Sequence, residues 1–186
     1  VEARVGLAAV GDLAAERAIV SQLATSLKTP RGQLTTRIAE LAASLKAAEK
    51  KIAAFEARAL TDRLPQLVES ATSVGAVRVV AQSLGEGSAA DDVRSLALQV
   101  RDRLGSDPAV VALGSVSGGR ATVVVVTNPT ARERGLAAGA LAKAAAGVLG
   151  GGGGGKPDVA QGGGTDAAAL PQALEGIVAD VRATTA

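Results

Sequence analysis

The sequence contains no Cys, His, Met, Trp or Tyr, and Phe55 is its only aromatic residue. Without Cys the chain forms no disulfide, and without Cys and His it lacks the usual zinc ligands and the imidazole of most acid–base catalysis. Since Met is also missing at position 1, we expect the chain to be a piece of a longer protein. No apolar run approaches the roughly 20 residues of a membrane span. We therefore expect no membrane partner and a cytoplasmic location.

The residues that are present favour a small folded protein with no overall charge bias. Hydrophobic residues make up 47% of the 186 positions, and Ala, Val, Leu and Ile supply almost all of them. The 20 basic and 18 acidic residues nearly balance. Net charge alone therefore does not argue for a nucleic-acid partner, and a nucleic-acid surface would have to be a local arrangement of Arg and Lys.

Residues 1–73 have the pattern of a helical hairpin. Asp12 can cap a first helix, and Pro30 and Gly32 interrupt the helical pattern. A second helix is predicted to begin near Gln33. Its apolar residues alternate in steps of four and three, which is typical of a coiled coil; they are Leu34, Ile38, Leu41, Leu45, Ala48, Ile52, Phe55 and Ala59.

This heptad seam has two explanations. It can pack the two helices on each other, or part of it can mate with a second chain as a dimer interface. The candidate interface residues are Leu34, Ile38, Leu41, Leu45, Ile52 and Phe55. Pro65 is expected to end or kink the second helix near Leu64.

From residue 74 the pattern changes to strands that alternate with helices. Strands are predicted over 75–83, 109–116 and 120–128, with a hairpin turn at 117–119 between the last two. Helices are predicted over 89–105, 130–149 and 166–184. Residues 74–186 should therefore form a globular domain with a mixed sheet, and the whole chain an α+β protein.

Two glycine runs, Gly150–Gly155 and Gly162–Gly164, flank the segment KPDVAQ. A flexible linker is a poor explanation, because helices of the same small domain are predicted on both sides. The letters GGGGGGK formally match a phosphate-binding P-loop, but Pro157 stands where that motif needs Ser or Thr. The run also follows a helix, whereas a P-loop follows a strand and opens a helix. The remaining interpretation is a loop that lets another surface approach its backbone closely.

The segment GGGGGGKPDVAQGGGTDAAALPQAL closely resembles the terminal motif of alanyl-tRNA synthetases. A looser glycine-rich version occurs in the accessory domain of DHH-type phosphoesterases, but there a His is usual and this chain has none. The resemblance is firm over residues 118–186 and rests on layout before that. It implies the C-terminal C-Ala domain with its DHH-associated globular part, and residues 1–11 as a remnant of the end of the editing domain.

The resemblance also implies a function without catalysis in this part of the chain. In the family, the corresponding domain contacts the outer corner of tRNA, helps to link aminoacylation with editing, and often supports dimerisation. The implied partners are tRNA, with alanine tRNA expected, the rest of the synthetase, and a second copy. No cofactor is expected here, since ATP, magnesium and the editing zinc belong to other parts of such enzymes.

The candidate RNA-binding residues are the glycines, for close approach, with Lys156 for a phosphate and Gln161 for a base or ribose edge. Arg120, Arg132 and Arg134 are candidate flanking cations, although ordinary solvated charges are the alternative explanation for them. The full candidate set is Gly151, Gly152, Gly153, Gly154, Gly155, Lys156, Gln161, Gly162, Gly163, Gly164, Arg120, Arg132 and Arg134.

Overall fold

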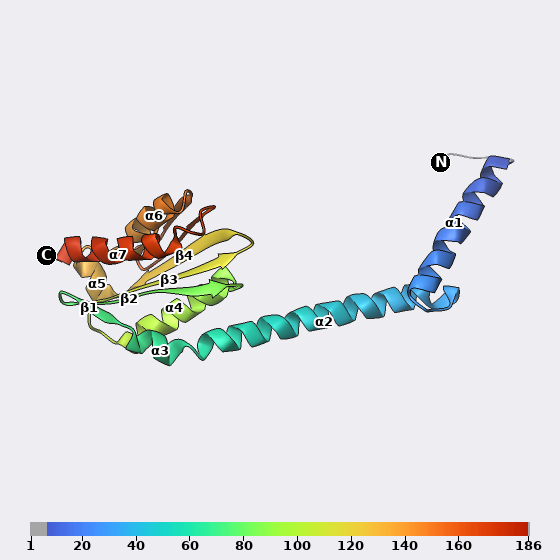
Figure 1. Cartoon of the computed structure of the whole chain (residues 1–186). Helices are drawn as coiled ribbons and strands as arrows, with labels where there is room; N and C mark the ends of the chain where they lie inside the picture. The colour runs from blue at the N-terminus through green and yellow to red at the C-terminus, as the bar shows by residue number, and fades with distance from the viewer. Residues whose placement is uncertain (1–6, 186) are drawn as a thin grey trace. The chain divides into compact units, whose positions relative to one another are not determined.

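The computed structural model describes residues 7–185, and it divides them into two compact units, one ending at Ala54 and the other beginning at Phe55. Figure 1 shows the elements of each unit. The expected remnant at residues 1–11 falls partly outside the described residues, because 1–6 are not among them.

The N-terminal unit consists of helix α1 (Leu7–Ser26), the 3₁₀ turn η1 (Arg31–Gln33) and the first part of helix α2 (Leu34–Thr61). The first helix begins earlier than the predicted start at Asp12, since α1 already begins at Leu7. The predicted interruption is present: Lys28 has a positive φ of 48°, and Pro30 precedes η1.

The heptad seam of α2 is exposed within this chain. Leu34 is buried, but its other large residues are 41–73% exposed, namely Ile38, Leu41, Leu45, Ile52 and Phe55. On α1, Leu13, Val20 and Leu23 are exposed as well. Of the two explanations left open for the seam, burial of these residues between the two helices is not what the single chain shows.

The globular unit begins earlier than the predicted boundary after residue 73. Leu60 at the end of α2 and Leu64 and Leu67 of helix α3 (Leu64–Glu69) are buried in the same apolar cluster as Val93 and Val100. Pro65 lies in the first turn of α3, where its missing N–H is harmless. Residues 55–73 thus pack with the globular unit.

The globular unit is built on a six-stranded mixed sheet with the order β1-β2-β3-β4-β6-β5. Only β2 and β3 pair in parallel, and the other neighbours are antiparallel. The predicted strands correspond to β2, β3 and β4, whereas β1, β5 and β6 were not predicted. The strands are β1 (Thr72–Val74), β2 (Val77–Glu86), β3 (Ala109–Ser117), β4 (Arg120–Thr127), β5 (Gly152–Gly155) and β6 (Val159–Gly164).

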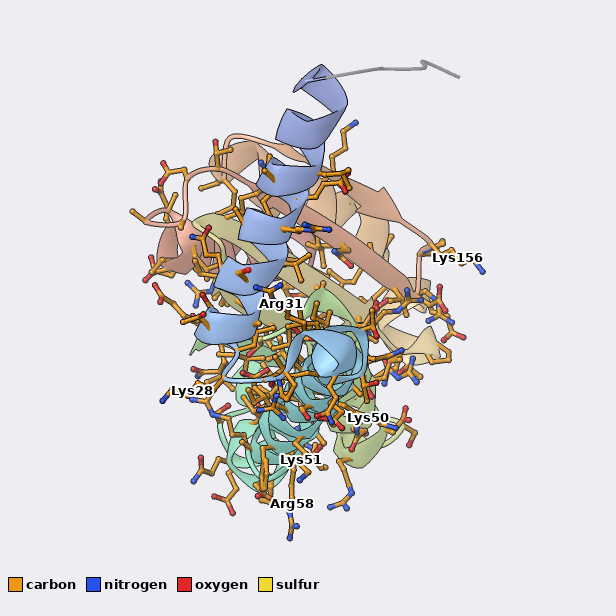
Figure 2. All side chains as sticks on the ribbon, turned by 90° about the vertical axis from the view of Figure 1, so that its right-hand side faces the viewer. Lys28, Arg31, Lys50, Lys51, Arg58 and Lys156 are labelled. Carbon is orange, nitrogen blue, oxygen red and sulfur yellow. The ribbon has the colours of Figure 1, made fainter. Side chains whose placement is uncertain are left out.

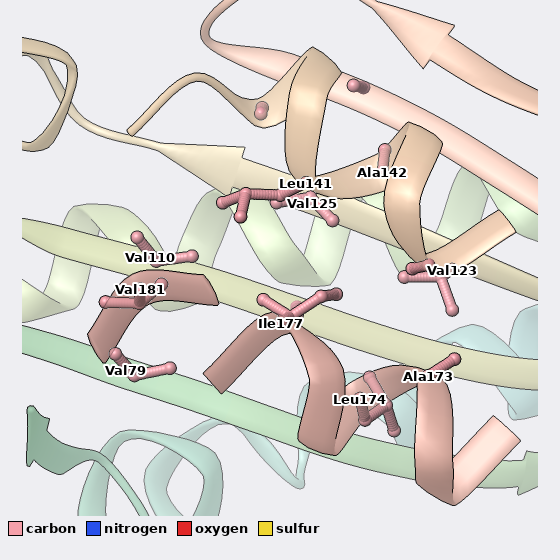
Figure 3. Packing of buried hydrophobic residues seen from close by; sticks show 14 of the residues in the cluster. Val79, Val110, Val123, Val125, Leu141, Ala142, Ala173, Leu174, Ile177 and Val181 are labelled. Carbon is pink, nitrogen blue, oxygen red and sulfur yellow. The ribbon is translucent and has the colours of Figure 1, made fainter. Parts of the chain in front are cut away.

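Helices cover both faces of this sheet (Figure 1). One face packs against α3 and helix α4 (Ala90–Leu104), and the other against helices α6 (Ala138–Val148) and α7 (Leu170–Thr185). Figure 3 shows Ile177 and Val181 of α7 and Leu141 of α6 above valines of the central strands. The predicted helix over 130–149 is in fact two helices, because Gly135 with a φ of 83° separates α5 (Pro129–Glu133) from α6.

Candidate nucleic-acid interface

The two glycine runs form a strand hairpin at one edge of the sheet. β5 and β6 are antiparallel, with Gly154 opposite Gln161 and Gly152 opposite Gly163. On its other side β6 pairs with β4, which places Val124 beside Gln161 and Thr122 beside Gly163. The predicted irregular loop is therefore an ordered extension of the sheet, with Lys156 in the connection between its strands.

One face of this hairpin is held very close to α6. A Cβ atom on Gly162 would lie 2.7 Å from the carbonyl oxygen of Ala142, and one on Gly153 would lie 2.9 Å from the same oxygen. Since real Cβ contacts are essentially never shorter than 3.0 Å, only glycine fits between the ribbon and the helix. Part of the glycine content is thus explained by packing inside the chain.

The other face of the hairpin is open. Cβ atoms on Gly152 and Gly154 would meet no atom within 4 Å. On this face, α4 packs on the neighbouring part of the sheet, where Val124 and Val126 of β4 lie in the same apolar cluster as residues of α4. The main contacts of α4 with the sheet are with β3 and β4, and not with the glycine strands. The glycine strands therefore form the floor of a shallow, uncovered surface at the edge of the sheet.

Two adjoining hollows lie on this open face and share Gln161. The first is lined by Gly154, Gly155, Lys156, Gln161 and the exposed Arg94 of α4. The second is lined by Arg120, Thr122, Gly152, Gln161 and Gly163. We call this surface the glycine floor. It consists of both hollows, with Lys156 and Arg94 at one end and Arg120 at the other.

The sequence pattern that defines the DHHA1 domain covers the strands and helices that build this floor. It matches residues 76–183, which is more than half of the chain. The chain belongs to the DHHA1 domain family.

Relatives of this DHHA1 domain extend the likeness to the helical unit. The chain is 64% identical over 177 residues to an alanine–tRNA ligase of Leifsonia xyli subsp. xyli and 56% identical over 177 residues to that of Clavibacter sepedonicus. These matches cover 95% of this chain but only 20% of each ligase. The chain thus spans about one fifth of the length of these curated relatives.

A solved structure is similar as well. The C-Ala domain of Aquifex aeolicus alanyl-tRNA synthetase matches with a TM-score of 0.54 and 25% identity, over 61% of this chain and 98% of that one. The resemblance to the C-terminal domain of alanyl-tRNA synthetases, drawn from the glycine motif, is confirmed.

The DHHA1 fold brings some of the predicted site residues together and separates others. The floor contains Lys156, Gln161 and the open-face glycines. Arg120 lies at the end of the floor away from Lys156, because its neighbour Ala121 pairs with Gly164, the last residue of β6. Arg132 instead donates a 3.0 Å hydrogen bond from Nη1 to the carbonyl oxygen of Thr127. Neither Arg132 nor Arg134 is among the residues that line the two hollows.

Arg94 is the cation of the floor that sequence reasoning missed. It lies in the first half of α4, where it follows the buried Val93 and reads as one more solvated residue of an amphipathic helix. Only the packing of α4 beside β4 places it at the same hollow as Lys156. No spacing in the sequence connects the two cations, which are 62 positions apart.

The described residues offer neither a metal site nor a membrane-spanning helix. Among residues 7–185, no group of three or more acidic residues has the arrangement to hold a metal ion. No helix in the described part of the chain is long and apolar enough to cross a membrane.

Proposed function

We propose that this chain is a tRNA-binding domain whose contact surface is the glycine floor, and that it has no catalytic site of its own. The observation that carries the proposal is the shallow floor, where glycines leave few side chains, with Gln161 at its centre and cations at both ends. The similarity to alanine–tRNA ligases makes tRNA the ligand to test first.

The chemistry of the floor fits an RNA backbone. Gly152 and Gly154 carry no side chain, so a sugar–phosphate chain can reach the strand backbone. Lys156 and Arg94 can neutralise phosphates, and Gln161 can both donate to and accept from a base or ribose edge. Because the chain has one aromatic residue, Phe55, which is not part of the floor, stacking contributes little here. Recognition should follow the shape of the RNA more than its base sequence.

In a parent synthetase this surface would hold the outer corner of tRNA while the acceptor end reaches the aminoacylation and editing sites. The remainder of the synthetase chain would then be a partner of this domain in the cytoplasm. ATP, magnesium and zinc would be bound by those other parts and not by the glycine floor.

A salt titration of tRNA binding tests the proposal. The 186-residue chain is titrated with alanine tRNA and with a non-cognate tRNA at several salt concentrations. We expect the logarithm of the affinity to fall linearly with the logarithm of salt, and the two tRNAs to bind about equally if the corner is recognised by shape. Absence of binding to either tRNA at low salt would contradict the proposal.

Lys156→Glu tests the position of the interface. We expect this variant to bind tRNA on the order of tenfold more weakly and to lower the salt slope by about 1, because one phosphate contact is lost. Lys143→Glu is the matched control: it makes the same charge change on an exposed residue of α6, on the opposite side of the hairpin. Equal effects of the two variants would indicate only a general charge effect.

Self-association is a second candidate function, favoured by the exposed apolar seam of α2. Leu45, Ile52 and Phe55 are 57–73% exposed on one face of a single helix, which is unusual for a surface that stays in water. A seam of this kind fits a second copy of the chain. Sedimentation over a range of concentrations tests it, and a strict monomer at high concentration would exclude it.

A further inference from the structure

A separate hollow of the globular unit lies toward the other edge of the sheet, where the end of α2 meets the end of β2. Its volume is about 280 Å³, and it shares no lining residue with the glycine floor. We call it the β2 hollow. Its lining includes Glu56, Leu60, Arg63, Leu84, Glu86 and Ser88, all of which belong to the unit that begins at Phe55.

Two carboxylates line the β2 hollow from different elements. Glu56 lies near the end of α2, and Glu86 is the last residue of β2. Both are exposed, and neither forms an ion pair with another residue that the structure describes. Two like charges at one hollow repel each other, so a bound cation would lower their electrostatic energy.

Arg63 lines the hollow as well, but it does not neutralise the two carboxylates. Its Nη1 donates a 2.8 Å hydrogen bond to the carbonyl oxygen of Leu84. Within the described part of the chain it forms no ion pair with Glu56 or Glu86. With two carboxylates and one guanidinium, the lining has a net charge of −1.

A buried hydroxyl adds a third acceptor to the hollow. Ser88 is 8% exposed, and its hydroxyl takes part in no hydrogen bond with another described residue, although its carbonyl oxygen accepts from Ser115. No side-chain polar atom of the described residues is both fully enclosed and unpaired. The Ser88 hydroxyl therefore opens into the hollow that it lines, where its lone pairs can accept from a ligand.

These acceptors suit an ammonium group better than a guanidinium group. An ammonium is compact and has three donors that point in different directions, whereas a guanidinium is planar and suits a single carboxylate that it binds with two parallel bonds. In the β2 hollow the three acceptors come from three segments, namely α2 for Glu56, β2 for Glu86 and the residues before α4 for Ser88.

The apolar part of the lining suits an alkyl stem. Leu60 and Leu84 line the hollow and are only 7% and 6% exposed, because the rest of each side chain lies in the apolar cluster with α4. Long amines bury their methylene groups on apolar surface and keep the charged end among polar groups. A ligand with an alkyl stem and an ammonium end would match both parts of the hollow.

We propose that the β2 hollow binds a primary alkylammonium group, with its charged end at Glu56, Glu86 and Ser88 and its stem on Leu60 and Leu84. Free polyamines carry such a group, and so does a lysine side chain of another protein. The proposal is independent of tRNA binding, because the β2 hollow and the glycine floor have no residue in common.

Titration of the 186-residue chain with butylamine at pH 7 tests the proposal. The ligand is then protonated, since alkylamines have pKa values near that of lysine, about 10.4. Backbone amide shifts in ¹⁵N–¹H NMR spectra should be confined to the surroundings of Gly87 and Ser88 and should saturate with a Kd on the order of millimolar, as expected for a small ligand at exposed charges. Acetate and methylguanidine are compared at the same ionic strength, because salt screens exposed charges.

Carboxylate variants locate the binding. Glu86→Gln and Glu56→Gln should each weaken butylamine binding about threefold, because a neutral amide replaces a charged acceptor. Glu69→Gln is the matched control, since it makes the same change at an exposed residue of α3 that does not line the hollow. Circular dichroism verifies that all three variants are folded.

Two further ligands distinguish the sources of the ammonium group. Tighter binding of putrescine than of Nα-acetyllysine methylamide would support a free polyamine, and the reverse order would support a lysine of a partner protein. Equal effects of Glu86→Gln and Glu69→Gln would overturn the site, as would tighter binding of acetate or methylguanidine than of butylamine. Absence of saturable shifts with butylamine would also overturn it, and would leave the glycine floor untouched as a tRNA site.

Discussion

At the scale of single residues, the glycines of the β5–β6 hairpin fall into two groups according to the direction of their missing side chains. Gly153 and Gly162 face α6, where the carbonyl oxygen of Ala142 leaves no room for a Cβ atom. Gly152 and Gly154 face solvent and have room. The first group is required for folding, and the second is available for a ligand.

Alanine substitutions should separate these two roles. We expect Gly162→Ala to lower the free energy of unfolding by about 2 kcal/mol or more, because the added methyl group forces α6 away from the sheet. Gly154→Ala should change it by no more than about 1 kcal/mol, and in the stabilising direction, since Ala loses less backbone entropy than Gly. Urea unfolding followed by circular dichroism measures both, and similar losses in the two variants would contradict this division.

At the scale of elements, one buried side chain ties together the end of the sheet away from Arg120. Asn128 is 4% exposed and caps α5 through a 3.0 Å hydrogen bond from the Ala131 N–H to its Oδ1. The same oxygen accepts from the Ala109 N–H at the start of β3, also at 3.0 Å. Its Nδ2 donates to the carbonyl oxygen of Asp107 at 2.6 Å. One amide thus fixes α5, β3 and the segment that precedes β3.

Replacing Asn128 should destabilise the chain more than the loss of a single helix cap. We expect Asn128→Ala to lower the free energy of unfolding by about 3 kcal/mol, because it removes the cap and leaves two further backbone groups without a partner. Thr184→Val is the milder control, because it removes an exposed hydroxyl that donates only to the carbonyl oxygen of Asp180 within α7, away from the Asn128 network. Thermal unfolding of both variants measures the difference, and equal shifts would show that the Asn128 network adds nothing beyond one hydrogen bond.

The sequence predicted helices and strands well where apolar periodicity was strong, and poorly where tertiary packing determines the conformation. The strand predicted over 120–128 is β4, and its unbroken run Val123–Val126 is fully buried. Glycine disfavours strands, so β5 could not be predicted from its own residues. Its conformation comes from pairing with β6 and from the contact with α6. Arg94 was missed for a related reason, because tertiary packing alone brings it to Lys156.

At the scale of the whole molecule, the segment that matches the DHHA1 family and the segment that packs as the globular unit do not begin at the same residue. The DHHA1 match begins at residue 76, close to the boundary predicted from the change of period. The apolar cluster on the α4 side nevertheless includes Leu60, Leu64 and Leu67, each about 7% exposed. A globular unit that began at residue 74 or at residue 76 would lose these three side chains and uncover part of α4.

Two truncated chains test where the globular unit ends. Residues 55–186 should fold cooperatively as a monomer, because they keep the whole core and lose most of the α2 seam. Residues 74–186 should be less stable by about 5 kcal/mol, since three buried leucines contribute about 1.5–3 kcal/mol each. Such a loss approaches the entire stability of a typical domain, so this shorter chain should be largely unfolded or aggregated.

Circular dichroism with urea unfolding compares the two truncated chains, and a tRNA titration of residues 55–186 connects the result to function. If the glycine floor holds the RNA, this shorter chain should keep the salt-dependent binding of the 186-residue chain and its sensitivity to Lys156→Glu. Equal stability of both truncated chains would show that α3 is dispensable. Loss of tRNA binding from a well-folded 55–186 chain would instead place an essential RNA contact on the N-terminal helices, where Lys28 and Lys50 are exposed to solvent (Figure 2).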